Sequence, residues 1–382
     1  MQLPIGLVFS VLSAVNGLLP ITSPTRFTSI PNASFHPHSH ILSASGSSPS
    51  GYLPIQIRTA YGLTPSSPQG EGKSIAIVGA YTAPELSKDL AMFTTRSHLT
   101  PMNGTEGRPS CTTKAGPHPC LEIHTAGVLS NAGWAVEAAL DTEWAHAIAP
   151  QADIIVIQAT DSSARSLAKA VTLAASLQPT TASMSWGGTE FTHETDWDAT
   201  FAKTRFVASS GDKGTGASFP ATSPNVLSVG GTSLSLDAAG KKIAPEKAWS
   251  GSGGGSSSYE QRPIYQKGAW LPVPGQKRLI PDVSYNADPL TGYAVYSGSK
   301  WLTVGGTSAG APQWAALLTL SSKPLSNVSL YKIGSGSVHK TVFTDILSGR
   351  NGHCSFLCLT RPGFDEVTGF GTPLAPGLIK QG

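Results

Sequence analysis

Charged residues are scarce in this sequence. Asp, Glu, Lys and Arg make up 13% of its 382 residues, about half the share that is usual in globular proteins. Lys and Arg together number 26 against 23 for Asp and Glu, and no basic run or basic patch interleaved with aromatic residues occurs. We therefore expect no nucleic-acid partner. A surface with few titratable groups would also suit acid conditions.

Long apolar runs are missing as well. Beyond the N-terminus, no stretch approaches the roughly twenty apolar residues that a membrane-spanning helix needs. We therefore expect a soluble protein without a membrane partner.

The N-terminus has the order of regions that is typical of a secretory signal. It begins MQLP, continues IGLVFSVLSAV and then turns to small and polar residues. The usual positive residues are missing, and an internal apolar strand would have the same pattern. We expect residues 1–17 to be a signal peptide and the protein to be secreted. Three N-glycosylation sequons, which a eukaryotic secretory route would use, lie at Asn32, Asn103 and Asn327.

Cysteine is rare, and its four residues form two close pairs. Cys111 lies near Cys120, and Cys354 lies near Cys358, each pair in a loop-like segment. An even number in local pairs indicates two loop-stapling disulfides in a secreted protein, although four cysteines allow three pairings. Neither pair has a second Cys or His pair spaced for zinc.

Regular periodicity is missing from Leu18 to about Tyr52. This segment is rich in Ser, Pro and His. Three of its histidines lie close together, at His36, His38 and His40. They could bind a metal, but the composition is typical of a flexible polar arm. We interpret residues 18–52 as a linker or propeptide remnant and residues 53–382 as one globular domain.

The rest of the chain alternates short apolar runs with helical patterns. Five runs have the character of buried strands: SIAIVGAY at 74–81, ADIIVIQAT at 152–160, TTASMSW at 180–186, RFVASSGD at 205–212 and NVLSVGGT at 225–232. Helical patterns separate several of them, notably at 164–177. This alternation predicts a parallel sheet covered on both faces, an α/β architecture. Functional sites in such sheets form at the carboxyl ends of strands, where SMSWGG and SSGDKG lie.

Two carboxyls share one face of an expected helix. Apolar residues recur at helical spacing in NAGWAVEAALDTEWAHAIAP, residues 131–150. Glu137 and Asp141 are four residues apart, so their side chains lie one turn from each other. Two carboxyls held that close tend to share a proton, which raises the pKa of one and makes it a usable base. The alternative is an ordinary solvated helix face, which this pair taken alone favours.

The segment GGTSAGAP at 305–312 runs directly into an apolar stretch, which predicts a strained turn with Ser308 at the start of a helix. A nucleophilic serine needs a base. His124 and His146 are the candidates in the expected core, but neither lies at a glycine-lined strand end, so both are expected to be structural. Asp212 does lie at such a strand end. It could cap a helix, bind a cation or, when protonated, donate to an oxyanion.

Taken together, these segments resemble the sedolisins, or serine-carboxyl peptidases, a family with a subtilisin-like fold. The matching segments, in order, are EAALD, SMSWGG, SSGDKG, FPATSPNVLSVGGTSL, AWSGSGGGSS, PDVSYNADPLTGYAVY, GGTSAGAP and GFDEVTGFGTPL. They span roughly residues 53–376. The resemblance implies a subtilisin-like parallel sheet flanked by helices, a peptidase catalytic domain over residues 53–382, and protein or peptide substrates. We also expect a monomer.

The resemblance implies a role for each candidate residue. Ser308 would be the nucleophile, Glu137 the general base and acid, and Asp141 the group that orients Glu137. Asp212 would donate a hydrogen bond to the oxyanion. Because only a protonated carboxyl can donate, the resemblance implies an acid optimum.

The resemblance also implies a substrate-binding edge. SMSWGG would be a strand that pairs with the peptide backbone of the substrate. The binding residues in it would be Ser185, Trp186 and Gly187, although a buried core tryptophan is the alternative for Trp186. SGSGGGSS at 250–257 lacks the Lys-Ser/Thr of a phosphate site and is interpreted as a flexible loop on the substrate side.

Near the C-terminus, FTDILSGRNG and RPGFDEVTG resemble the calcium site of the family. One Ca²⁺ would be bound by the carboxylates of Asp345 and Asp365 and by the backbone carbonyls of Ile346, Arg361 and Gly363, an oxygen shell that suits calcium. Without the resemblance, two Asp residues in Gly-rich loops would be interpreted as turn residues. The second cysteine pair lies between the two halves and could alter the ligand geometry.

Two features depart from the family pattern. Sedolisins usually carry a large folded prodomain that assists folding and blocks the site, and about fifty residues are too few to contain one. Lys213 follows Asp212 where a small residue is more usual, and its charge would favour the ionised aspartate unless it points to solvent. We expect an active acid endopeptidase or tripeptidyl-peptidase. The alternatives are a non-catalytic peptide-binding protein on the same fold and a hydrolase that uses His124 or His146.

Overall fold

The structure is a computed structural model that describes residues 31–109, 111, 118–268, 270–271, 273–354 and 356–382. The expected signal peptide at 1–17, together with residues 18–30 of the expected linker, lies outside the described residues.

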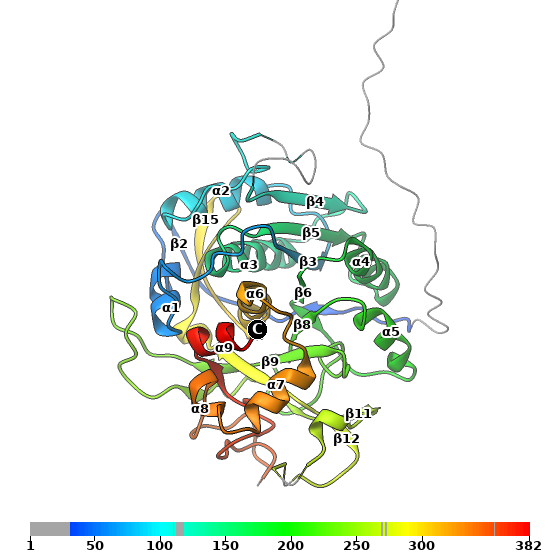
Figure 1. The fold of residues 1–382 in the computed structure, drawn as a ribbon. Coiled ribbons are helices and arrows are strands. Elements are labelled where there is room, and N and C mark those ends of the chain that lie inside the picture. Colours follow the sequence, from blue (N-terminus) through cyan, green and yellow to red (C-terminus); the bar gives the residue numbers. More distant parts are fainter. Residues whose placement is uncertain (1–30, 110, 112–117, 269, 272, 355) are drawn as a thin grey trace, which may run out of the picture.

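A mainly parallel sheet of eight strands forms the centre of the molecule (Figure 1). Its strands follow the order β10-β9-β8-β6-β3-β5-β4, with β13 pairing β9 and with β10 antiparallel to its neighbour. The strands are β3 (Ser74–Ala80), β4 (Leu121–Thr125), β5 (Asp153–Ala159), β6 (Thr181–Met184), β8 (Phe206–Ser209), β9 (Val226–Ser233), β10 (Lys247–Ala248) and β13 (Val283–Asn286). Each of the five runs predicted as strands overlaps one of them. The prediction of an α/β fold is confirmed.

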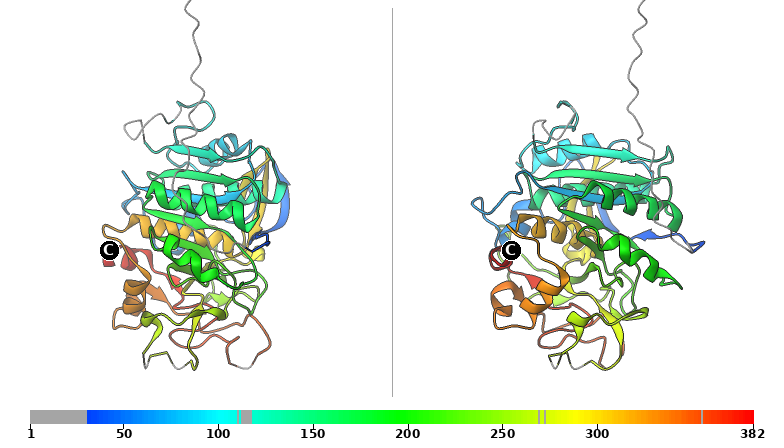
Figure 2. Two further views of the ribbon diagram at one scale, coloured as in Figure 1. Left: turned by 90° about the vertical axis from the view of Figure 1, so that its right-hand side faces the viewer. Right: turned by 45° about the vertical axis from the view of Figure 1, so that its right-hand side comes forward.

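Helices cover both faces of this sheet, as the views in Figures 1 and 2 show. The helices α2 (Leu86–Arg96), α3 (Ala132–Ile148) and α6 (Thr307–Leu320) lie on one face, and α4 (Ala164–Leu177) and α5 (Asp198–Phe201) on the other. Alternate strand residues point to each side, so that Ile75 and Ile77 pack in the core with α3, whereas Ala76 and Val78 pack in the core with α4. The helices predicted at 131–150 and 164–177 are confirmed.

The helix α6 is buried along its whole length, which explains why it is apolar on every side. Among the helices in the described ranges, none is both long enough and apolar enough to cross a membrane.

Smaller elements surround the sheet. The remaining helices are α1 (Pro54–Ala60), α7 (Asn327–Gly334), α8 (His339–Val342) and α9 (Ala375–Gln381), with 3-10 turns at Glu194–Trp197, Ile264–Gln266 and Pro289–Thr291. The remaining strands are β1 (His36–Pro37), β2 (His40–Gly46), β7 (Trp186–Gly187), β11 (Gly255–Gln261), β12 (Lys277–Ile280), β14 (Tyr293–Ser297), β15 (Lys300–Gly305), β16 (Phe343–Thr344) and β17 (Thr372–Pro373). The strands β14, β15 and β2 form a three-stranded sheet.

Residues 34–46 of the expected linker pair with the rest of the chain. The strand β1 runs antiparallel to β7, and β2 runs antiparallel to β15. Phe35 is 1% exposed and packs against Trp186 and Phe219. A composition rich in Ser, Pro and His does not reveal this pairing, because backbone hydrogen bonds need no particular side chain. The domain boundary at residue 53 stays a prediction.

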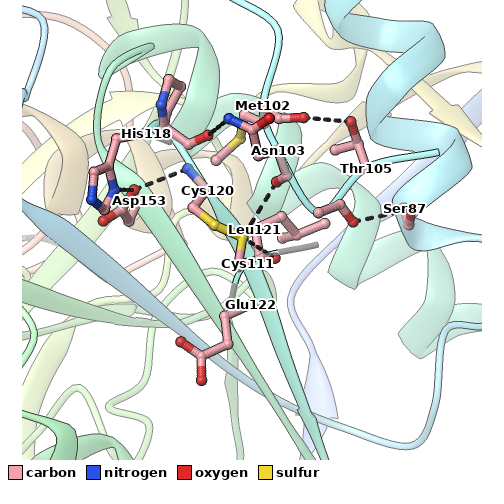
Figure 3. Close-up of a disulfide and its surroundings, with 12 residues drawn as sticks. Ser87, Met102, Asn103, Thr105, Cys111, His118, Cys120, Leu121, Glu122 and Asp153 are labelled. Carbon is pink, nitrogen blue, oxygen red and sulfur yellow. Dashed lines mark hydrogen bonds and ion pairs between the residues drawn. A yellow bond between two sulfur atoms is a disulfide. The ribbon is translucent and has the colours of Figure 1, made fainter. Parts of the chain in front are cut away.

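Both local disulfides predicted from the sequence are present, Cys111–Cys120 and Cys354–Cys358. Figure 3 shows the first, at the start of β4. Beside it, Asp153 Oδ1 accepts a hydrogen bond from the backbone N–H of Cys120 at 2.9 Å. The disulfide therefore fastens the connection between α2 and β4 to the edge of the central sheet.

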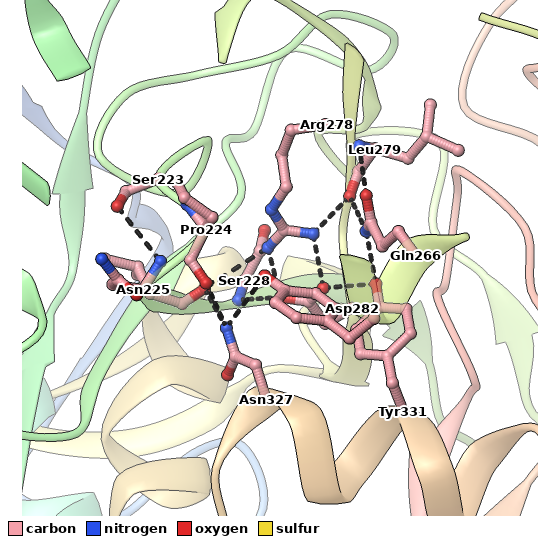
Figure 4. Close-up of polar contacts among 12 residues, drawn as sticks. Ser223, Pro224, Asn225, Ser228, Gln266, Arg278, Leu279, Asp282, Asn327 and Tyr331 are labelled. Carbon is pink, nitrogen blue, oxygen red and sulfur yellow. Dashed lines mark hydrogen bonds and ion pairs between the residues drawn. The ribbon is translucent and has the colours of Figure 1, made fainter. Parts of the chain in front are cut away.

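A buried ion pair joins the C-terminal elements to the sheet (Figure 4). Arg278 donates to both carboxylate oxygens of Asp282, at 2.7 and 2.6 Å, and Asp282 also accepts from the Tyr331 hydroxyl. Nearby, the Asn327 side-chain amide donates to the carbonyls of Pro224 and Val226 at 3.1 and 3.0 Å. The side-chain nitrogen of Asn327, the atom that a glycan would be attached to, therefore makes hydrogen bonds within the fold.

Candidate active site

Ser308 is the second residue of α6 and follows a turn that requires glycine. Gly306 has φ 118°, a conformation that favours glycine, and a Cβ there would collide with Asp212 and with the carbonyl of His38. The strained turn predicted from GGTSAGAP is therefore present. Ser308 is fully buried, and its Oγ lies 3.1 Å from the carbonyl of Ser185, to which it can donate.

Glu137 and Asp141 project from α3 into the same buried region. Each is 2% exposed, so the alternative of an ordinary solvated helix face is wrong. Asp141 Oδ1 accepts a hydrogen bond of 2.6 Å from the Ser185 hydroxyl. Since Ser185 also provides the carbonyl next to Ser308 Oγ, one residue connects the carboxyl pair to the serine.

Burial raises the pKa of both carboxyls. For Glu137, burial is the largest cause and the charge of Asp141 the second, while the hydroxyls of Ser39 and Ser308 lower the pKa. For Asp141, burial outweighs the influence of Ser185 and Glu137, both of which lower the pKa. Two buried carboxyls this close titrate as a pair, which retains a proton above the ordinary range for Asp and Glu. One member can then act as a base while the other holds a proton.

Asp212 lies next to the serine, where the chain leaves β8. Its Oδ1 accepts from both the backbone N–H and the hydroxyl of Thr307, at 2.8 and 2.7 Å. Its Oδ2 lies 3.1 Å from Nε2 of His40. The side chain of Asp212 is 5% exposed, whereas Lys213 is exposed. The lysine therefore extends toward solvent. In this arrangement its charge has the least influence on the ionisation of Asp212.

Residues 34–40 cover this site. His36 pairs with Gly187 across β1 and β7, and the carbonyl of His38 accepts from the backbone N–H of Ser308 at 3.1 Å. His38 Nδ1 lies 2.8 Å from the hydroxyl of Ser209. The contacts of His38, Ser39 and His40 with the site were not predicted. The HPHSH run was visible in the sequence, but nothing in it distinguishes a free polar arm from a docked one.

The three expected substrate-binding residues lie between this segment and the core. Ser185 and Trp186 are fully buried. The indole N–H of Trp186 donates to the carbonyl of Val78 at 2.8 Å, which fits the alternative of a core tryptophan. Gly187 forms part of β7, and a Cβ on it would collide with the backbone of Phe219.

The two histidines expected to be structural make contacts elsewhere. His146 is fully buried on α3, where its Nε2 lies 2.9 Å from the carbonyl of Thr100, and burial lowers its pKa to about 4. His124, on β4, lies 2.8 Å from Glu122. Neither arrangement resembles a base directed at Ser308.

The five expected calcium ligands come from two segments, 345–346 and 361–365, which a hydrogen bond joins. Asp345 Oδ2 accepts from the backbone N–H of Gly363 at 2.8 Å, and Asp365 Oδ2 from that of Arg361 at 2.9 Å. Asp345 Oδ1 is buried and has no hydrogen-bond partner in the described part of the chain. Within that part, no group of three or more His, Cys, Asp or Glu is arranged to hold a metal. The two carboxylates supply oxygen atoms of the kind that Ca²⁺ prefers, and the calcium site stays a prediction.

Comparison with known proteins places the chain in a family. A family model described as the subtilase family matches residues 124–344, more than half of the chain. Kumamolisin from Bacillus sp. (strain MN-32) is 30% identical over 375 residues, an alignment that covers 87% of this chain and 64% of kumamolisin. Sedolisin from Pseudomonas sp. (strain 101) is 32% identical over 195 residues, which cover 44% of this chain and 33% of that protein. The chain thus spans less than two thirds of the length of these curated relatives.

A solved structure agrees with the sequence comparisons. Pseudomonas sedolisin, described as a serine-carboxyl proteinase complexed with two molecules of pseudo-iodotyrostatin, superposes with a TM-score of 0.73 at 25% identity. The superposition covers 87% of this chain and 98% of that one. The chain therefore belongs to the subtilase family and, within it, to the sedolisins, the serine-carboxyl peptidases.

Proposed function

We propose that this chain is a secreted acid serine-carboxyl peptidase that hydrolyses protein or peptide substrates through Ser308, Glu137 and Asp141. The observation that carries the proposal is the buried carboxyl pair beside the serine. The Ser308 hydroxyl lies near enough to Glu137 to lower its pKa, and Ser185 bonds both Asp141 and Ser308. A pair that shares a proton provides the base that a serine nucleophile needs.

In the proposed reaction, Glu137 accepts the proton of Ser308 Oγ as the oxygen attacks the substrate carbonyl. Glu137 then gives this proton to the leaving amine as the C–N bond breaks, which leaves an acyl-enzyme on Ser308. A water molecule loses a proton to Glu137 as it attacks the ester, and Ser308 regains a proton when it leaves. Asp141 orients Glu137 throughout by sharing its proton.

Asp212 is the proposed donor to the oxyanion. Its Oδ1 already accepts two hydrogen bonds from Thr307, so a proton on this carboxyl belongs on Oδ2. A neutral Asp212 would then direct an O–H group from Oδ2 to the oxyanion, beside the backbone N–H of Ser308. Because this donor exists only while Asp212 is protonated, turnover requires acid conditions.

Substrate would bind along β7, where β1 lies in the described structure. A peptide that replaced residues 34–40 would pair with Gly187 as an added strand. The N-terminal segment must therefore leave before a substrate carbonyl can reach Ser308.

We also propose one Ca²⁺ in the C-terminal loops, held by Asp345, Asp365 and the carbonyls of Ile346, Arg361 and Gly363. The proposal is supported by the oxygen donor set and by the unpaired Asp345 Oδ1. The ion would supply positive charge that holds the two carboxylate loops together. It has no part in the reaction steps above.

The test is digestion of a peptide library by the full-length chain between pH 2 and 7 with calcium, read by mass spectrometry. We expect cleavage in acid by the wild type and none by Ser308→Ala or Glu137→Gln, while His146→Gln retains activity if it folds. The cleavage positions separate an endopeptidase from a tripeptidyl-peptidase. A folded wild type that cleaves nothing and takes no active-site aldehyde would instead support the non-catalytic, peptide-binding alternative.

A further inference from the structure

A small cavity lies between the central sheet and α3, beside the carboxyl pair. About 10 Å³ of it is open to the centre of a water molecule, close to the lower limit for holding one water. Its lining includes Gly79, Gln158, Trp134, Glu137 and Asp141. The cavity is thus shared between the sheet and the proposed catalytic helix.

The cavity exists because one strand position has no side chain. Gly79 on β3 and Gln158 on β5 are direct neighbours in the parallel register. A Cβ on Gly79 would meet only ring carbons of Trp134, at 3.8 Å. The site could therefore hold a larger side chain, and glycine leaves that space empty of protein atoms. Gln158 points to the same side of the sheet as Val156, toward α3.

Two residues that line this space, Gln158 and Glu137, carry buried polar atoms without hydrogen-bond partners among the described residues. Gln158 is 3% exposed; its Oε1 accepts from the Thr125 hydroxyl at 2.9 Å, but its Nε2 has no hydrogen-bond partner among the described residues. The hydroxyls of Ser39 and Ser308 lie close enough to Glu137 to lower its pKa, but neither carboxyl oxygen makes a hydrogen bond of full geometry within the same part of the chain. A buried amide donor and a buried carboxyl acceptor on one cavity are groups that native proteins usually satisfy with water.

We propose that the cavity holds one water molecule, which accepts from Gln158 Nε2 and donates to the Glu137 carboxylate. Gln158 is then a positioning residue for the base, an inference that rests on the proposed function for its catalytic effect. The water favours the ionised form of Glu137. The other titratable groups that act on Glu137 are Asp141 on the same helix, Asp212 beyond β8 and His40 in the N-terminal segment. None of these lies on β5.

Two variants remove the bridge by different routes. Gln158→Leu removes the donor, and Gly79→Ala places a methyl group in the cavity. In each variant, Glu137 should be harder to ionise. The low-pH side of the profile of kcat/KM against pH, its acid limb, should therefore move up by roughly half to one pH unit. Below the limb, kcat/KM should fall about three- to tenfold, whereas the plateau should stay within about twofold of wild type. Ile75→Val, on the same face of β3 but outside the cavity lining, should lower the melting temperature without moving the limb.

A crystal structure of the wild type at acid pH gives a readout that needs no turnover. It should show an ordered water within hydrogen-bond distance of Gln158 Nε2 and Glu137, absent from Gly79→Ala. A dry wild-type cavity, or active variants with an unmoved acid limb, would overturn the inference. A wild type without activity but with the water in place would contradict the proposed function and leave the bridge itself supported.

Discussion

His40 Nε2 lies 3.1 Å from Asp212 Oδ2. A histidine of the N-terminal segment thus contacts the carboxyl oxygen that the proposed mechanism needs as a donor. The hydrogen bond with Asp212 is the main cause that raises the pKa of His40. The imidazolium is bound most tightly while Asp212 is ionised, so acid that protonates Asp212 weakens the hold of the segment on the site.

Replacing His40 should make Ser308 easier to reach. His40→Gln removes the imidazolium, and because His40 is half exposed we expect a modest effect, about two- to fivefold faster labelling of Ser308 by an active-site aldehyde at pH 5 to 6. The difference should shrink as the pH is lowered, because protonation of a carboxyl removes its ion pair with an imidazolium. His36→Gln is the matched control, since His36 lies in the same run and is exposed. Equal labelling of wild type and His40→Gln at pH 6 would show that the contact does not retain the segment.

Asp212→Asn should change the shape of the pH profile. The amide Oδ1 can keep both hydrogen bonds from Thr307, while its N–H₂ group takes the place of Oδ2 and donates at every pH. We expect a lower maximum, by about ten- to a thousandfold as for other changes to oxyanion donors, but no decline of kcat/KM as the pH rises from 4 to 7. Steady-state kinetics on a peptide substrate across this range measures both effects. A variant whose activity still declines with rising pH would mean that another group controls that limb.

Local sequence patterns indicated the residues of the candidate site but not their environment. Glu137 and Asp141 are four apart on one helix, and adjacent glycines precede Ser308, so short segments made them candidates. Their roles came from the family resemblance and stay predictions. Whether the carboxyl pair is solvated depends on α3 lying between the sheet and its neighbours, a tertiary relationship. Four-residue spacing alone favoured the solvated alternative, which the structure contradicts.

Contacts between distant segments could not be predicted. His40 and Asp212 are far apart in sequence, and their contact depends on the pairing of β2 with β15, which places His40 opposite Gly305. The cavity beside Glu137 depends on the register that places Gly79 next to Gln158. The periodicity of apolar residues in the sequence predicts neither relationship, because each depends on how the strands pair after the chain folds.

Stability should fall as the pH rises from about 4 to 8, because several carboxyls are held protonated in the folded state. Burial raises the pKa of a set of carboxyls: Glu137, Asp141, Asp198, Glu143, Glu194 and Glu260. A carboxyl with a raised folded pKa stabilises fully below its unfolded pKa and less as the pH rises through the folded value. Urea unfolding at pH 4, 6 and 8 should give decreasing free energies.

Glu143→Gln tests one of these groups. Glu143 is fully buried and accepts from the backbone N–H of Tyr296 at 3.0 Å, a bond that glutamine can keep. The variant should lose less stability than wild type between pH 4 and 8. His146 acts in the opposite direction, since its lowered pKa costs stability as the pH falls from 6.5 toward 4. A free energy of unfolding that rises steadily with pH would contradict the prediction.

Removal of calcium should lower the stability of the protein but leave the arrangement of side chains around Ser308 unchanged. A ligand that binds only the folded state stabilises it by about 2.7 kcal/mol at a concentration one hundred times its dissociation constant. Dialysis against a chelator should therefore lower the melting temperature by several degrees, and millimolar Ca²⁺, but not Mg²⁺, should restore it. In Asp345→Asn, the side-chain oxygen can still accept from Gly363, while the charge for the ion is lost. This variant should melt near the temperature of the chelated wild type and respond little to calcium. If wild type and variant respond equally, the ion is not bound at Asp345.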